Sequence, residues 1–243
     1  MKNNYQYFKS VQYIAFDFCG TLADLLPSST ALLKSFFQKN GIKEFLESDI
    51  DVALNKALKH AHYSSVIINT EKLRSDYYVG FNKLVLKYLE VDTDKAEELY
   101  SFFKSHKRHW VLKPGALQII PELKKRNYKL IIVSNFDSNL EDIVSKLGIH
   151  NEFEGFYVSG NIGLEKPSLE FYNHVITSLA CPPQEIVMVG DDIFLDVYPS
   201  IESGLNCIHI DGSDIKLNSH VSEIYKNRYI KIDQLSELSS FLP

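Results

Sequence analysis

Short apolar segments alternate with helical segments along most of the chain, and a polar turn follows several of the apolar ones. Each segment is rich in β-branched or aromatic side chains and too short for a helix, so we predict strands at 13–16, 130–133, 156–158, 186–189 and 206–210. Nearly continuous apolar strands that alternate with helices are typical of a parallel sheet covered on both faces. The sequence therefore predicts an α/β fold with a doubly wound parallel sheet.

Helical patterns fill the intervals between these strands, at about 116–126, 138–148, 168–179 and 236–241, with one more that ends near Gly204. The segment Ser138-Asn139-Leu140-Glu141 has the capping-box pattern, in which a hydroxyl and a carboxylate each satisfy a free backbone N–H. We therefore expect the helix there to begin with a side-chain cap and to end at Gly148.

A long helical block interrupts the alternation directly after the first strand. Four helices are predicted, with no strand between them, at about 28–40, 48–62, 70–89 and 93–109. The block predicts a second, all-helical domain inserted into the sheet domain. We place the sheet domain at 1–25 and 111–243 and the helical domain at 26–110.

Composition restricts the environment and the partners of the chain. A formal net charge of −5 over 243 residues gives no basic footprint for nucleic acid, and no apolar run approaches the ~18 residues that span a bilayer. The N-terminal segment has no apolar core of a signal peptide, and the three cysteines are widely spaced. We expect a reduced cytoplasmic protein, monomeric or homodimeric, in which Cys181 and Cys207 are small buried apolar residues.

Polar side chains gather where four of the predicted apolar segments end. Parallel strands bring their carboxyl ends to one edge of the sheet, where ligands bind in open α/β folds. Two acids, a hydroxyl and a lysine at such an edge predict a site for phosphate and Mg²⁺, which prefers carboxylate oxygens. These turns are Asp17 to Thr21, Ser134-Asn135, Gly163 to Pro167, and Gly190-Asp191-Asp192.

Four motifs, in this order and at these strand ends, resemble those of the haloacid dehalogenase-like superfamily, and the resemblance covers essentially the whole chain. They read FDFCGTLAD, IIVSN, GLEKP and VMVGDDIFLDV. Within the superfamily the chain is similar to the subgroup that has a helical cap inserted after the first strand. The resemblance implies a Rossmann-like core, a cap at 26–110, and hydrolysis of a small phosphorylated metabolite.

The resemblance also implies how a phosphoryl group is held and attacked. Asp17 is similar to the nucleophile that forms an aspartyl intermediate. Lys166 resembles the lysine that offsets the charge of nucleophile and phosphoryl group. The groups implied to contact the phosphoryl oxygens are Gly20, Thr21, Ser134 and Asn135. For Ser134, an ordinary strand-end turn stays open as an alternative.

A second set of residues is implied to hold Mg²⁺. Asp17 and Asp191 resemble the carboxylate ligands, Cys19 would contribute its main-chain carbonyl, and Asp192 or Asp196 would support the metal waters. Aspartates directly after a strand also cap helix N-termini, so each of the three later acids has a purely structural alternative.

One position departs from the pattern of ordinary phosphatases in the family, which carry a second aspartate two residues after the nucleophile. This chain has Cys19 there. The aspartate normally protonates the leaving oxygen and then activates water, and such acid–base help is worth about 10²–10⁴-fold. A thiol, with a pKa of ~8.5, is disfavoured as a thiolate beside Asp17 and a phosphate. We therefore expect slow turnover, or a leaving group that needs no proton.

Three hypotheses follow. The first is a Mg²⁺-dependent phosphatase. The second is phosphonatase-like or phosphotransferase chemistry, in which the substrate or the cap, for example Lys56 or Lys59, supplies the missing group. The third is a protein that binds a phosphorylated ligand without turnover. Asp17, Lys166 and Asp191 form a charge-balanced set, which argues against the third.

Overall fold

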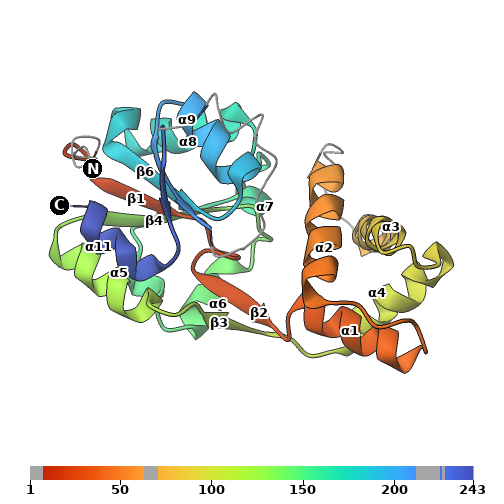
Figure 1. Cartoon of the computed structure of the whole chain (residues 1–243). Coiled ribbons are helices and arrows are strands. Elements are labelled where there is room, and N and C mark those ends of the chain that lie inside the picture. Colours follow the sequence, from red (N-terminus) through yellow and green to blue (C-terminus); the bar gives the residue numbers. More distant parts are fainter. Residues whose placement is uncertain (1–7, 63–70, 212–224, 226–227, 243) are drawn as a thin grey trace. The chain divides into compact units, whose positions relative to one another are not determined.

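The computed structural model describes residues 8–62, 71–211, 225 and 228–242, apart from the side chains of residues 59, 61, 62 and 71. The chain divides into two compact units (Figure 1). The first unit comprises residues 1–24 and 110–243, and the second comprises residues 25–109. Lys59, one of the two cap lysines considered above, lies outside the described side chains.

The first unit is built on a parallel sheet, which confirms the predicted α/β class. Among the described residues the sheet has six strands in the order β5-β4-β1-β6-β7-β8, and every recorded pairing is parallel. The order places the first strand of the chain in the interior of the sheet, between strands that come more than a hundred residues later. The strands are β1 (Tyr13–Phe16), β4 (Lys129–Ser134), β5 (Gly155–Val158), β6 (Ile186–Gly190), β7 (Asn206–Ile210) and β8 (Ile230–Ile232).

Strand register brings the predicted polar turns to one edge. Phe16, the last residue of β1, is aligned with Ile132 on β4 and Val189 on β6. The next residue along β1 is Asp17, and β4 and β6 end one or two residues further on. Side chains from sequence-distant turns therefore meet beyond the carboxyl ends of three adjacent strands.

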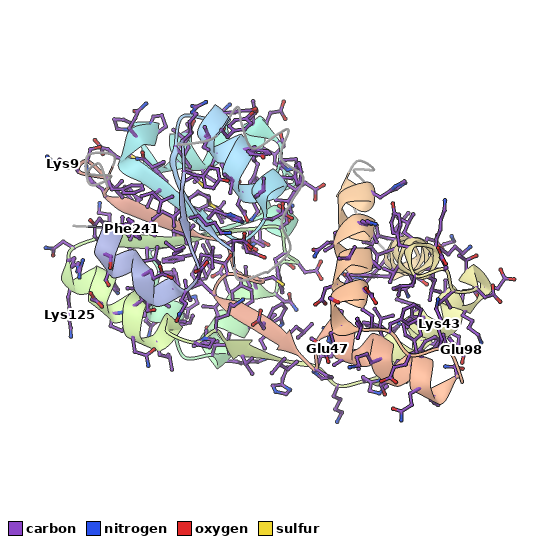
Figure 2. All side chains as sticks on the ribbon, in the orientation of Figure 1. Lys9, Lys43, Glu47, Glu98, Lys125 and Phe241 are labelled. Carbon is purple, nitrogen blue, oxygen red and sulfur yellow. The ribbon has the colours of Figure 1, made fainter. Side chains whose placement is uncertain are left out.

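Helices cover both faces of the sheet, as Figure 1 shows for α5 and α11 on one side and α8 and α9 on the other. One apolar cluster packs the first face and includes Ile120 and Leu238, and the second cluster includes Tyr172 and Ile201. Lys125 on α5 lies at the periphery of this unit (Figure 2). The helices are α5 (Ala116–Lys125), α6 (Leu140–Lys146), α7 (Ser159–Ile162), α8 (Leu169–Leu179), α9 (Tyr198–Glu202) and α11 (Leu238–Phe241).

The second unit is a helical bundle with an apolar core of its own, which includes Phe36, Leu86 and Leu99. Its first helix begins where the Ser28 hydroxyl accepts a hydrogen bond from the Ala31 N–H at 3.1 Å. The helices are α1 (Ser29–Lys39), α2 (Glu47–His62), α3 (Glu71–Tyr88) and α4 (Ala96–Ser105), with the 3₁₀ turn η2 (Thr93–Lys95) before α4.

Several elements differ from the sequence prediction. Two short strands, β2 (Ala23–Leu26) and β3 (His109–Leu112), pair with each other, and neither was predicted. The predicted helix over 93–109 was therefore too long, since α4 ends at Ser105. Strand β8 was not predicted.

Smaller differences concern single residues. The capping-box prediction was wrong, because Asn139 precedes α6 and no side chain caps that helix. Cys207 is buried as predicted, whereas Cys181 is only partly buried. The remaining 3₁₀ turns are η3 (His150–Glu152), η4 (Pro183–Glu185) and η6 (Leu235–Glu237). Among the described helices, none combines the length and the apolar character that crossing a bilayer requires.

Candidate active site

Asp17 stands at the centre of the polar edge of the sheet. Its N–H donates to the Val189 carbonyl at 2.9 Å, which continues the pairing of β1 with β6. Its carboxylate is buried, and the oxygen Oδ1 accepts from the Ser134 hydroxyl at 2.9 Å and from the Lys166 ammonium at 2.8 Å. Within the described part of the chain, no hydrogen bond reaches Oδ2 of Asp17. One carboxylate oxygen is thus held in place while the other stays available.

The turn after Asp17 is anchored by its apolar member. Phe18 is fully buried, and its ring centroid lies 5.0 Å from that of Trp110 and 5.7 Å from that of Phe136. The Phe18 carbonyl accepts from the N–H groups of Leu22 and Ala23, both at 2.9 Å. This tight turn places the exposed Cys19 between the buried residues Phe18 and Thr21.

Gly20 is required at its place in the turn. Its φ is +83°, a conformation that side chains with a Cβ rarely adopt, and a Cβ there would lie 2.4 Å from Oδ2 of Asp191. The Gly20 carbonyl accepts from the Lys113 ammonium at 2.8 Å. The next residue, Thr21, is buried and donates its hydroxyl proton to Oδ1 of Asp191 at 3.0 Å. The first motif and the last motif are thus packed directly against each other.

Lys166 is buried between two carboxylates. Its ammonium lies 2.8 Å from Oδ1 of Asp17 and 2.6 Å from Oδ1 of Asp196. Burial alone would lower the pKa of Lys166, but the charges of Asp17 and Asp196 outweigh it and raise that pKa above its ordinary value. The lysine therefore carries a positive charge in this site.

The Asn135 side chain binds the main chain of Lys166. Its amide nitrogen donates to the Lys166 carbonyl at 2.8 Å, and its amide oxygen accepts from the Lys166 N–H at 2.8 Å. Both ends of the side chain are bound to the main chain of the lysine, so the structure places Asn135 as a support for Lys166.

The three acids after β6 face different ways. Asp192 caps the π-helical turn η5 (Ile193–Val197), because its Oδ1 accepts from the N–H groups of Phe194 at 2.7 Å and Leu195 at 3.0 Å. Asp196 folds back over Gly190, where an added Cβ would lie 2.3 Å from its carboxylate. The structure therefore assigns the helix-capping alternative to Asp192 and brings Asp196 into the site.

Carboxylate oxygens of Asp17, Asp191 and Asp196 all lie within 4.8 Å of one another. Asp191 reaches solvent, yet protein surrounds its carboxyl group, and this desolvation together with the charges of Asp17 and Asp196 raises the pKa of Asp191 well above its ordinary value. Desolvation likewise raises the pKa of Asp196 to about 7, against the opposing effect of Lys166.

The Lys166 ammonium contacts Asp17 and Asp196, and its single positive charge does not balance the three carboxylates when all of them are ionised. A divalent cation bound through these carboxylate oxygens would offset the excess negative charge. Carboxylate oxygens are ligands that Mg²⁺ prefers, so this set of residues fits Mg²⁺.

Two residues at this edge were not predicted. Lys113 contacts the nucleophile turn through its side chain, as above, and through its N–H, which donates to the Leu22 carbonyl at 2.9 Å. His209 on β7 lies 3.0 Å from the Asp191 carbonyl through Nε2. No motif marks either of them, although a histidine between the apolar residues Ile208 and Ile210 is a sequence feature that could have indicated His209.

A family model described as haloacid dehalogenase-like hydrolase matches residues 14–210. The chain is 31% identical over 151 residues to mouse haloacid dehalogenase-like hydrolase domain-containing protein 3, a match that covers 62% of this chain and 58% of that protein. It is 26% identical over 137 residues to a glyceraldehyde 3-phosphate phosphatase of Methanothermobacter thermautotrophicus, which covers 53% of this chain and 58% of the phosphatase. The chain thus spans little more than half the length of these relatives.

Among solved structures, the fold is similar to the HAD-hydrolase YfnB of Bacillus subtilis, a structure described as bound to magnesium. The TM-score is 0.68 at 21% identity, over 96% of this chain and 98% of the other. This likeness concerns the fold.

Proposed function

The chain belongs to the haloacid dehalogenase-like hydrolases, and we propose that it is a Mg²⁺-dependent phosphatase that acts on a small phosphorylated metabolite through an aspartyl-phosphate at Asp17. The observation that carries this proposal is the state of the Asp17 carboxylate. It is buried, one oxygen is fixed by a hydroxyl and an ammonium, and the other oxygen has no hydrogen bond within the described residues. A buried, oriented carboxylate with one oxygen to spare has the properties of a nucleophile.

In the first step, Oδ2 of Asp17 forms a bond to phosphorus while the bond from phosphorus to the leaving oxygen breaks. Lys166 offsets the combined negative charge of carboxylate and phosphoryl group, which would otherwise repel each other. A water then attacks phosphorus of the aspartyl-phosphate, the bond from phosphorus to Oδ2 of Asp17 breaks, and the phosphate leaves with the protons of that water while the carboxylate is restored.

Ser134 and Thr21 have a specific constraint in this scheme. Each hydroxyl has one proton, and each donates it to a carboxylate here, Ser134 to Asp17 and Thr21 to Asp191. Either hydroxyl must release its carboxylate before it can donate to a phosphoryl oxygen. We propose that Ser134 makes this exchange when substrate enters, while Thr21 keeps the Asp191 carboxylate in place.

The residues that would hold Mg²⁺ are Asp17, Asp191 and the main-chain carbonyl of Cys19, with Asp196 in support. When bound, Mg²⁺ supplies positive charge that stabilises the phosphoryl group in the transition state. The Asp196 carboxylate also lies 2.6 Å from the Lys166 ammonium. Asp196 therefore fixes the position of the lysine whether or not it also faces the metal.

Cys19 determines which substrates turn over. The thiol is exposed at the position where family phosphatases carry the proton-transferring aspartate. Substrates whose leaving group departs as an anion, such as aryl or acyl phosphates, need no proton at that step. The relative named as a glyceraldehyde 3-phosphate phosphatase supports a small phosphorylated metabolite as the natural substrate. We assign the choice of metabolite to the helical unit 25–109, which the family resemblance identifies as the cap.

The test is hydrolysis of an aryl phosphate by the wild type, Asp17→Asn and Cys19→Asp, with Mg²⁺ and with chelator. Asp142→Asn, an exposed acid on α6, is the matched control for loss of a carboxylate. We expect slow Mg²⁺-dependent release that Asp17→Asn abolishes, that Asp142→Asn leaves unchanged, and that Cys19→Asp raises by up to about 10²–10⁴-fold.

The remaining outcomes separate the alternatives. If the wild type releases no phosphate and Cys19→Asp does, the site is intact but lacks its proton carrier. That result would favour ligand binding or phosphotransfer. If neither the wild type nor Cys19→Asp releases phosphate, the phosphatase proposal is refuted. This outcome would leave chemistry assisted by a lysine of the helical unit, such as Lys56, which is exposed and lies over the Tyr88 ring at 5.8 Å.

A further inference from the structure

His209 is a polar side chain in the interior of the sheet. It is only 3% exposed, on a strand whose neighbours in sequence, Ile208 and Ile210, are buried apolar residues. In register it lies between Gly190 on β6 and Lys231 on β8. A buried imidazole is costly unless its polar atoms are paired, so its partner indicates why the position is not apolar.

The partner is the residue that follows β6. Nε2 of His209 lies 3.0 Å from the main-chain carbonyl oxygen of Asp191. A carbonyl oxygen only accepts, so Nε2 must carry the proton and donate it. Burial lowers the pKa of His209, which leaves the ring neutral, and the Tyr229 ring packs against it in a T-shaped arrangement with centroids 5.9 Å apart.

The Asp191 carbonyl lies where the regular ladder of the sheet ends. The backbone N–H of Asp211, two residues after His209, donates to the Ile232 carbonyl on β8 at 2.9 Å. That N–H is therefore already bonded to β8, and the Asp191 carbonyl accepts its hydrogen bond from the His209 imidazole. Asp191 is then held at two points, its carboxylate by Thr21 and its main chain by His209.

We propose that His209 is a positioning residue for the metal ligand Asp191: its Nε2–H fixes the peptide from which the Asp191 carboxylate projects toward Mg²⁺. The inference rests on the proposed function, because it assumes that Asp191 binds the metal. Partners that orient metal ligands typically contribute 10–100-fold to metal affinity.

Two variants of nearly equal length test this role. His209→Gln keeps an N–H donor at a position close to that of Nε2, and His209→Met fills similar space without a donor. The measurement is calorimetric titration of Mg²⁺ into the full chain without substrate. We expect His209→Met to weaken Mg²⁺ binding by about 10–100-fold and His209→Gln to restore most of that loss. Melting temperatures without metal report what each substitution costs the fold, and they should fall further for His209→Met, which leaves the buried Asp191 carbonyl without its donor.

Equal Mg²⁺ affinities for His209→Met and the wild type would overturn the inference and leave the proposed function intact. Equal losses for the Gln and Met variants would also overturn it, because the donor would then be irrelevant. A wild type that binds no Mg²⁺ would overturn both proposals.

A measurement on the wild type keeps the inference testable if either variant fails to fold. Long-range ¹H–¹⁵N NMR reports which ring nitrogen of His209 carries the proton. We expect protonation at Nε2 and a shift of this signal when Mg²⁺ is added. An unprotonated Nε2, or a signal that Mg²⁺ does not move, would refute the proposed role.

Discussion

Replacing Gly20 by alanine tests how closely the nucleophile turn and the metal-binding turn are packed. The new Cβ would lie 2.4 Å from Oδ2, 2.8 Å from Cγ and 2.9 Å from Oδ1 of Asp191. No side-chain atom tolerates such distances, so the Asp191 carboxylate must move and its hydrogen bond from Thr21 must break or lengthen. Gly148→Ala is the matched control, because Gly148 has a similar φ of +77° and a Cβ added there would have no neighbouring atom within 4 Å.

The two substitutions share one cost and differ in the other. Placing a non-glycine residue in the left-handed region costs about 1–2 kcal/mol at either position. At Gly20, loss of the bond between Thr21 and Asp191 adds about 1–3 kcal/mol. We therefore expect Gly148→Ala to lower the free energy of unfolding by about 1–2 kcal/mol, and Gly20→Ala by about 2–5 kcal/mol.

Metal binding should separate the two variants more sharply than stability. With its carboxylate displaced, Gly20→Ala should bind Mg²⁺ at least about tenfold more weakly than the wild type, whereas Gly148→Ala should bind it normally. Urea denaturation without metal and calorimetric Mg²⁺ titration measure the two quantities. Equal stability loss and equal Mg²⁺ affinity in the two variants would refute the close packing of Gly20 against Asp191.

Three further predictions concern neighbouring groups. Burial raises the pKa of Asp196 from 3.8 to about 7 in the folded, metal-free protein. Between these two pH values, Asp196 is protonated in the folded state and ionised in the unfolded state. The free energy of unfolding in chelator should thus fall as pH rises from about 4 to about 7, and Asp196→Asn should flatten this slope in urea titrations at several pH values. Lys113→Met, which frees the Gly20 carbonyl, should lower kcat by about 10–100-fold with little change in KM, whereas Lys113→Arg should retain more activity in steady-state assays. Asn135→Ala removes both hydrogen bonds to the Lys166 main chain and should lower the free energy of unfolding, measured in urea, by about 1–3 kcal/mol. An unchanged free energy of unfolding would show that the Lys166 main chain keeps its position without Asn135.

Strands with strong apolar runs were the most predictable part of the fold. Segments such as 130–133 and 186–189 are buried on both faces, so their composition alone distinguishes them. Strands β2 and β3 carry mixed sequences, ADLL and HWVL, and exist because they pair across more than eighty intervening residues. No local pattern encodes such a pairing.

The candidate site was predictable in its members and less so in their contacts. Motif order located Asp17, Lys166 and Asp191, which the structure places within one cluster of contacts. The choice between Asp192 and Asp196 depended on which carboxylate turns back toward the sheet, and both aspartates fit a helix N-terminus equally well in sequence. Lys113 and Asn135 bind main-chain atoms of distant turns, and the sequence does not show where those atoms lie.

The interruption of the sheet unit by residues 25–109 also bears on how the chain folds during synthesis. Tyr13 pairs with Lys129, so at about 5–20 residues per second β1 waits roughly 6–25 s for its partner strand to be made. The inserted helices have their own apolar core, and Nε of Arg108 donates to the Pro27 carbonyl at 2.9 Å, which ties the two ends of that segment together. Once the tie forms, the open loop between β1 and β4 shrinks from about 115 residues to about 30, which lowers its closure entropy cost by about 1 kcal/mol. The folded insertion therefore removes most of the loop-closure cost that its own length adds to the pairing of β1 with β4.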